Sequence, residues 1–332
     1  MKITYEHMYN ELFRVLVKNG FSHEKAQICS RIFTENSLDG VYSHGLNSFP
    51  SFIGSLQKGY INILAEPVLL ESLGAMERWD AGYGPGVLNA TFGMKRAIEL
   101  AKQNGIGCVA LRNSNHWMRG ATYGWQAANE GCIGLCWTTA LPAMPAWGGK
   151  EPKLGNNPIV FSVPKNEGHI VLDIALSQFS YGKMRTYNMN NEILPFEGGY
   201  DSDGNLTRDA GKILESKLAL PIGYWKGAGL SLLIDLISMV LSGGRSVSDL
   251  GRQEVEHGVS QVFTAFYLSR LSENNTMYDR INKVIDELHD SLLLNGFDQV
   301  RYPGEGTLRT RNQNLKEGIP VVGSIWDEVI NM

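Results

Sequence analysis

The chain has 332 residues, of which 43% are hydrophobic and 19% charged, and its net charge is −4. This composition is that of a globular protein and excludes a disordered chain, and without any dense run of Lys and Arg a nucleic-acid partner is not expected. No apolar stretch approaches the roughly 18 uninterrupted residues of a membrane span, and the N-terminus lacks the apolar segment of a signal peptide. We therefore expect a cytoplasmic protein with two lobes or one large α/β unit.

Residues 4 to 38 predict two helices. Thr4 can cap the first helix and Gly20 ends it, while Ser22 starts the second, which runs out at the Asp39-Gly40 turn. The Ser-His-Gly triplet at 43–45 follows in a loop or at the start of a further helix.

From about Val68 onward, short apolar runs bounded by glycine alternate with helical stretches, which is typical of α/β layers. Two of the runs are separated only by a polar turn, so they predict a hairpin and a mixed sheet. The expected helices are 93–105 and 123–129, and the expected strands are 107–113, 133–139, 159–164 and 169–175.

The C-terminal part contains a nearly all-apolar helix over 225–243. It is short and interrupted by glycine, so we expect a buried central helix and not a membrane span. A strand over 258–269 and an amphipathic helix over 277–292 follow.

These elements predict an α/β fold with a mixed sheet flanked by helices. We expect a mixed α/β domain over 68–270 and a helical lobe formed by both termini, in which 1–67 packs with 271–332.

A Rossmann fingerprint is missing. The nearest match to G-x-G-x-x-G, at 105–110, follows a helix and enters a strand, which is the inverse of the required context. The sequence also has no H-E-x-x-H, no paired C-x-x-C and no Asp/Glu/His cluster, so no metal is expected. The few, irregularly spaced cysteines suit a reducing compartment; they are Cys29, Cys108, Cys132 and Cys136.

Two histidines lie in segments that suggest chemistry. His44 is a side chain able to donate a proton near neutrality, although a lone histidine is more often a surface or core residue. His116 lies with Asn115 and Arg119 in a polar loop directly after a strand, a common place for ligands in α/β folds; a solvated turn that caps the next helix is an equal alternative.

Three other segments have similar double interpretations. Trp225 and Lys226 stand at the head of the apolar helix, where free N–H groups attract anions, or they form a surface pair. The turn at 301–306 offers glycines for a close ligand, or is a plain turn. The segment 155–158 either forms an Asx turn or lies close to a ligand.

The motifs together resemble the non-Rossmann malate/L-lactate dehydrogenase family. The resemblance covers nearly the whole chain in order and spacing: SHG at 43–45, SNH at 114–116, GNNP at 155–158, VLDIA at 171–175 and KGAGLSLLIDLIS at 226–238.

This resemblance implies an NADH-dependent reduction of a small 2-keto acid by a homodimer, with His44 as the acid/base. The substrate pocket would hold His116, Asn115 and Arg119. NAD(H) would be held by His169, Ile170, Val171, Leu172, Asp173, Ile174, Ala175, Trp225, Lys226, Gly304, Glu305 and Gly306. The choice of NADH over NADPH comes from the resemblance alone.

Other activities in the family stay open. They are dehydrogenation of malate, lactate or ureidoglycolate and reduction of a cyclic imino acid, and a cofactor-binding regulatory protein without turnover is the non-enzymatic alternative. Many relatives carry an arginine four residues after the histidine, suited to a carboxylate, where this chain has Ser48. Either Arg119 or Lys183 holds the carboxylate in place of that arginine, or the substrate preference of this chain differs. Asn156 replaces a threonine common in the family.

Overall fold

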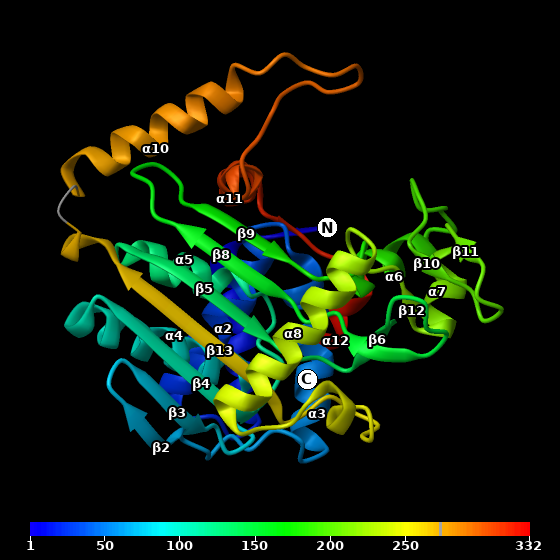
Figure 1. Ribbon diagram of the computed structural model, residues 1–332. Helices are drawn as coiled ribbons and strands as arrows, with labels where there is room; N and C mark the ends of the chain where they lie inside the picture. Colours follow the sequence, from blue (N-terminus) through cyan, green and yellow to red (C-terminus); the bar gives the residue numbers. More distant parts are fainter. Residues whose placement is uncertain (272–273) are drawn as a thin grey trace.

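The computed structural model describes residues 1–271 and 274–332, and it is built around a seven-stranded sheet (Figure 1). Neighbouring strands run antiparallel except for the parallel pair β3 and β4. In spatial order the strands are β2 (Val68–Leu73), β3 (Met76–Asp80), β4 (Ile106–Ser114), β13 (Val259–Tyr267), β5 (Cys132–Thr138), β8 (Ile159–Val163) and β9 (Ile170–Ile174). The expected mixed, non-Rossmann sheet and its β8–β9 hairpin are confirmed.

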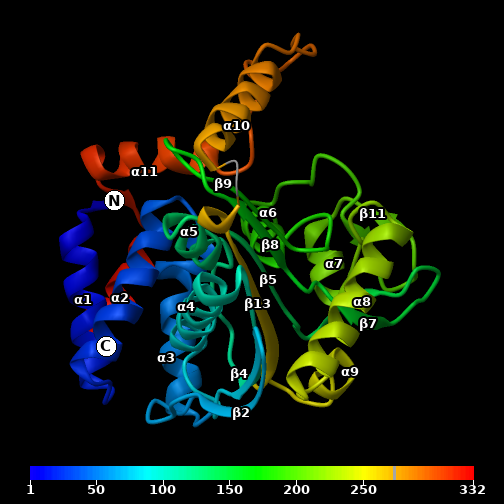
Figure 2. The same cartoon turned by 60° about the vertical axis from the view of Figure 1, so that its left-hand side comes forward.

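Helices cover both faces of this sheet. Figure 2 shows α4 (Gly86–Asn104) and α5 (Ala121–Asn129) on one face and α8 (Trp225–Ser242) on the other. At Gly107 a methyl group would lie 2.1 Å from the carbonyl oxygen of Ala97, so glycine lets α4 pack directly on β4. The central strand β13 is buried from Val259 through Ala265.

Both chain ends meet beside the first helices. The expected caps are confirmed, because Thr4 accepts a hydrogen bond from the backbone of α1 (Tyr5–Lys18) and Ser22 from that of α2 (His23–Leu38). A core cluster joins these helices and α3 (Phe49–Gln57) to α12 (Gly323–Asn331). Strand β1 (Lys2–Ile3) pairs with β14 (Ile319–Pro320). The domain boundaries at 67 and 270 stay a prediction.

A smaller unit, formed by segments before β8 and after β9, was largely missed from the sequence, because its elements are short. It contains a third hydrophobic cluster. Its elements are β6 (Pro142–Pro145), β7 (Pro152–Gly155), α6 (Tyr181–Met189), β10 (Gly199–Tyr200), β11 (Leu206–Thr207), α7 (Ala210–Ser216), β12 (Leu218–Ala219) and α9 (Val247–Leu250).

Near the C-terminus, α10 (Asn274–His289) projects from the body of the molecule, and α11 (Glu305–Glu317) returns the chain to α2 (Figures 1 and 2). The amphipathic helix expected over 277–292 is confirmed as α10. The turn at 301–306 leads directly into α11.

The prediction that 225–243 forms a buried central helix is wrong. The face of α8 that packs on the sheet is made mostly of small and polar residues, including Ser231, Asp235 and Ser238, together with Ile234. Most of the large apolar side chains of α8 are exposed, and the helix is long and apolar enough, by length and composition alone, to cross a membrane. These exposed residues are Trp225, Leu230, Leu232, Leu233, Leu236, Ile237 and Val240.

Candidate active site

The Ser-His-Gly triplet packs tightly on the end of α2. His44 closes the 3-10 turn η1 (Tyr42–His44), and its carbonyl oxygen accepts a hydrogen bond from Asn36 Nδ2 at 2.9 Å. A methyl group at Gly45 would lie 2.2 Å from Ser37 Oγ and 2.7 Å from Ser37 N, so only glycine fits there. This contact fixes the backbone from which the imidazole of His44 projects.

The imidazole of His44 lies against that of His116. The ring centroids are 5.8 Å apart and the ring planes differ by 10°. Ser43 Oγ is 3.0 Å from His44 Nδ1. Within the described residues Nε2 has no hydrogen-bond partner, so it is the ring atom left for a ligand.

Burial lowers the pKa of His44 to about 4; the neighbouring His116 and Arg119 add to this shift, and Asp173 opposes it. Burial also lowers the pKa of His116 to about 4. Solvent nevertheless reaches His116, which counts among the exposed residues. The histidine pair is thus packed against protein at His44 and reached by solvent at His116.

The loop after β4 is held by the other predicted pocket residues. The amide nitrogen of Asn115 donates to the carbonyl oxygens of Tyr83 at 2.8 Å, Gly84 at 3.0 Å and Tyr60 at 3.3 Å. The backbone of Met118 has φ 64° and donates to His116 Nδ1 at 3.1 Å. Asn115 therefore orients the loop, because its donors are already engaged.

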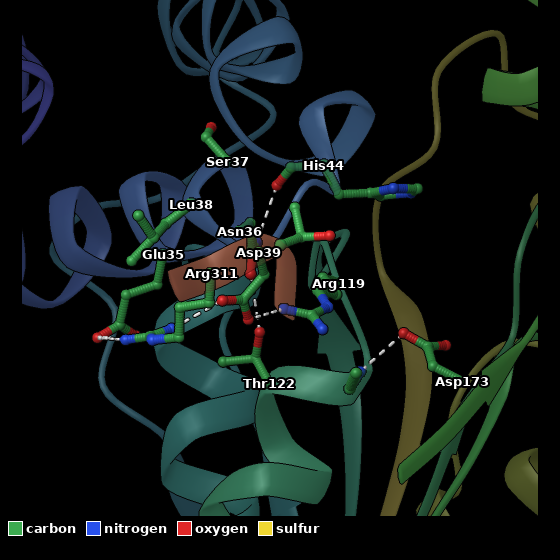
Figure 3. A network of polar contacts seen from close by, with 12 residues as sticks. Glu35, Asn36, Ser37, Leu38, Asp39, His44, Arg119, Thr122, Asp173 and Arg311 are labelled. Atoms are coloured by element: carbon green, nitrogen blue, oxygen red, sulfur yellow. Dashed lines mark hydrogen bonds and ion pairs between the residues drawn. The ribbon is translucent and has the colours of Figure 1, made fainter. Parts of the chain in front are cut away.

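Arg119 belongs to an ion-pair network behind His44 (Figure 3). Its guanidinium pairs with Asp39, and both side chains are less than one tenth exposed. Asp39 also accepts from Arg311 Nη1 of α11 at 2.8 Å. Thr122 Oγ1 of α5 donates to Asn36 Oδ1 at 2.9 Å, which ties the same helix end to α5.

Asp173, predicted among the cofactor contacts, lies near His44. Its Oδ2 accepts a hydrogen bond from the backbone N–H of Ala121 at 2.8 Å, at the first residue of α5 (Figure 3). Burial raises the pKa of Asp173, while that N–H, Arg119 and His44 oppose the rise. The carboxylate thus faces the start of a helix, an end that favours negative charge.

Two of the predicted cofactor segments meet at the start of β9. Val171 N donates to the carbonyl oxygen of Pro303 at 2.9 Å. Gly304 has φ +96°, and a methyl group there would lie 3.1 Å from Val171 N. Gly304 and Gly306 line a hollow of about 560 Å³ that also borders Asp39.

The third cofactor segment approaches the other end of β9. Ile222 N donates to the carbonyl oxygen of Leu176 at 2.8 Å, just before Trp225 and Lys226 open α8. Both of these side chains are exposed, and the N-cap residue Tyr224 makes no side-chain capping bond. All three segments are therefore linked through β9.

The remaining cofactor candidates have local roles. His169 holds the hairpin, since its Nδ1 accepts from Lys165 N at 3.1 Å and its Nε2 is 2.9 Å from Asn129 Oδ1. Burial lowers the pKa of His169. Glu305 accepts from Tyr302 N at 3.1 Å at the start of α11. Half-buried positions along and after β9 are Ile170, Leu172, Ile174 and Ala175.

Sequence reasoning missed Asp39, which was interpreted only as part of a turn. It is 80 residues from Arg119 and 272 from Arg311, and no spacing rule connects charges so far apart. It also missed Ser43 as the partner of His44, although the two are adjacent. A serine directly before a histidine could have indicated a hydrogen bond between the hydroxyl and the imidazole.

The comparisons with known proteins agree with this geometry. A family model described as malate/L-lactate dehydrogenase matches residues 3–330. The chain belongs to the malate/L-lactate dehydrogenase family and is an oxidoreductase, as the sequence motifs had predicted.

Particular relatives narrow the comparison. A protein from Citrobacter koseri named 2,3-diketo-L-gulonate reductase is 42% identical over 330 residues, with 99% of each chain covered. A Pasteurella multocida protein of the same name is 41% identical with the same coverage. The crystal structure of malate dehydrogenase from Entamoeba histolytica aligns with a TM-score of 0.95 at 26% identity, covering 100% of this chain and 96% of that one.

The Asp39 network generates a stability prediction. Asp39→Asn leaves Arg119 buried without its counter-charge, so we expect the free energy of unfolding to fall by about 3 kcal/mol. Urea denaturation measures this fall. Lys2→Met, which removes the exposed ion pair with Glu317, is the control and should cost less than about 1 kcal/mol. Equal losses in the two variants would contradict a central role for Asp39.

Proposed function

We propose that this chain uses NADH to reduce the C2 carbonyl of 2,3-diketo-L-gulonate to the alcohol, giving 3-keto-L-gulonate, with His44 as the proton donor. The observation that carries the proposal is the unengaged Nε2 of His44, next to His116 and within the electrostatic reach of Asp173 on β9. Two full-length relatives bear the name of this activity.

The residues around β9 fit a nicotinamide dinucleotide. Gly304 leaves a cradle that a side chain would fill, and both α8 and α11 start without a side-chain cap, so their N–H groups are suited to phosphate oxygens. In this proposal the segments 169–175, 225–226 and 304–306 hold the cofactor. When bound, the dihydronicotinamide supplies the hydride.

His44 must carry a proton when the carbonyl oxygen becomes an alkoxide. A pKa of about 4 leaves the ring almost entirely neutral at pH 7 in the free protein. The carboxylate of Asp173 favours the charged ring, and so does the negative charge of a bound keto acid. We infer that His44 gains its proton as the substrate binds, while Arg119 acts by holding the loop of His116.

We also propose a cytoplasmic homodimer in which the exposed apolar face of α8 meets a second copy. Leu233 is 55% exposed and Val240 63% exposed on this face. Burial of such side chains contributes about 25 cal/mol per Å², and exposed apolar patches of this kind mark interaction surfaces. Because Trp225 and Lys226 open the same helix, the dimer would place the cofactor site near the interface.

The first prediction concerns the proton donor. His44→Ala should lower kcat for 2,3-diketo-L-gulonate by roughly a hundredfold or more, because a general acid contributes about that much. Stopped-flow absorbance of NADH measures the rate, and a fluorescence titration should show NADH affinity changed by less than about twofold. His23→Ala, at an exposed histidine on α2, is the control. Full activity in the His44 variant would refute the assignment.

The second prediction concerns pH. Asp173→Asn removes the charge that favours protonated His44, so the pKa of His44 should fall further, by about one unit. Reduction needs the protonated ring, so its kcat/KM profile should move to lower pH and the rate at pH 7 should drop about tenfold. Asp203→Asn, in an exposed turn, should leave the profile in place. A profile that stays unshifted in Asp173→Asn would separate this carboxylate from the proton transfer.

The third prediction concerns the dimer. Leu233→Glu places a charge in the proposed interface, so light scattering should give the mass of one 36.8 kDa chain instead of two. Leu64→Glu, at a residue 82% exposed away from α8, should leave the dimer intact. The proposal fails if the wild type is a monomer at micromolar concentration or if both variants behave alike.

A further inference from the structure

The start of α6 lies against the residue that precedes His44. Ser180 caps this helix by accepting from Lys183 N at 3.2 Å, and Tyr181 donates its hydroxyl to the carbonyl oxygen of Ala143 at 2.7 Å. A methyl group at Gly182 would lie 3.1 Å from Ser43 Cβ and 3.3 Å from Ser43 Oγ. The first turn of α6 is thus packed on the His44 segment.

Lys183 brings a positive charge to this turn. Its side chain is exposed, and Nζ lies 5.6 Å from the centroid of the Phe179 ring. Among the described residues, no carboxylate pairs with it. A lysine stem is flexible, and Lys183 directly follows Gly182, the residue that packs on Ser43; binding of a ligand near Ser43 would require Nζ to swing away from the face of Phe179.

The position of Lys183 is unfavourable for the helix itself. A cation in the first turn opposes the helix dipole, which favours negative charge at this end. Lys183 therefore gives α6 no electrostatic benefit. An anion beside His44, by contrast, would be attracted both by the lysine and by the start of the helix.

Arg119, the other cation considered for the substrate, is already engaged. It is 6% exposed and paired with Asp39, and withdrawing it would leave a buried carboxylate short of one partner. Ser48 adds no charge, and its hydroxyl is already engaged, because it donates to the carbonyl oxygen of Ser43.

We propose that Lys183 binds the carboxylate of the keto-acid substrate and so sets the carbonyl in front of His44. This inference rests on the proposed function and adds a specificity residue to it. A single ammonium group attracts a carboxylate as a point charge, without the fixed two-pronged geometry of arginine.

The test compares Lys183→Met with Lys183→Arg. Two measurements are made: KM and kcat for 2,3-diketo-L-gulonate, and the Kd of oxamate for the enzyme–NADH complex from NADH fluorescence. Oxamate carries the same carboxylate next to a carbonyl and is not reduced. Loss of one charge-assisted hydrogen bond should raise KM and the oxamate Kd roughly 10- to 100-fold in Lys183→Met. We expect kcat to change less than about threefold, and Lys183→Arg to retain most of the affinity.

Two further variants separate a specific role from a general one. Arg185 lies about 200° around the helix from Lys183, so Arg185→Met should change the oxamate Kd less than about threefold. Adding Ser48→Arg to Lys183→Met should restore part of the affinity, because the new guanidinium would extend from position 48, whose present side chain is hydrogen-bonded to the backbone of Ser43. NADH affinity should stay within about twofold in every variant.

The outcomes distinguish the two proposals. If the wild type does not oxidise NADH with 2,3-diketo-L-gulonate, the proposed function fails, and the oxamate titration still decides the role of Lys183. An unchanged oxamate Kd in Lys183→Met, a wild type that does not bind oxamate, or an effect confined to Arg185→Met would overturn the inference. A loss of NADH affinity in Lys183→Met would overturn it as well, by assigning the lysine to the cofactor.

Discussion

The pairing of one carboxylate with two arginines holds the candidate site together. Asp39 stands at the C-terminal end of α2, Arg119 follows β4 and Arg311 belongs to α11. This contact joins the helical segment that carries His44 to the loop that carries His116 and to α11. Because the pair of Asp39 with Arg119 is buried, it is little screened by salt, and its charge-assisted hydrogen bond fixes the relative orientation of the two side chains. The two segments that it ties together are the ones whose imidazoles, His44 and His116, lie stacked.

The same network places His44 between opposing influences. Burial, His116 and Arg119 disfavour a charge on the ring, and Asp173 favours one. A ring poised in this way is sensitive to any further negative charge that arrives. In the proposed mechanism that charge belongs to the substrate, so protonation and substrate binding are coupled by simple electrostatics.

Features governed by neighbours in sequence could be predicted. The caps at Thr4 and Ser22, the β8–β9 hairpin and the absence of a Rossmann turn all follow from local chemistry. The position of His44 after α2 followed in the same way, whereas its role came from the family resemblance. Features that depend on residues far apart in the sequence could not be predicted. Asp39 is the clearest example, since its two arginines lie 80 and 272 residues further along the chain.

The apolar helix α8 shows a different limit. Its composition predicted a buried helix, yet composition cannot say which face of a helix packs on the protein, and most of the large apolar side chains are exposed. In the structure its serines and Asp235 face the sheet, where Asp235 Oδ1 accepts from Val247 N at 2.8 Å. The leucines face outward, and the proposed homodimer is what would remove them from water.

Strand β9 explains why sites for an extended ligand can arise here without a Rossmann turn. It is the last strand of the sheet, and an edge strand has backbone groups that pair with no further strand; Val171 N uses one of them to bond Pro303 of the turn before α11. In this chain that edge is bordered at one end by the turn before α11 and at the other by the turn before α8. Five residues of strand separate the two ends by roughly 17 Å, so two uncapped helix starts are held at a fixed spacing. In the proposed function, an extended, negatively charged cofactor lying along this edge would meet N–H donors at both ends, and its middle would pass beside Asp173, close to His44.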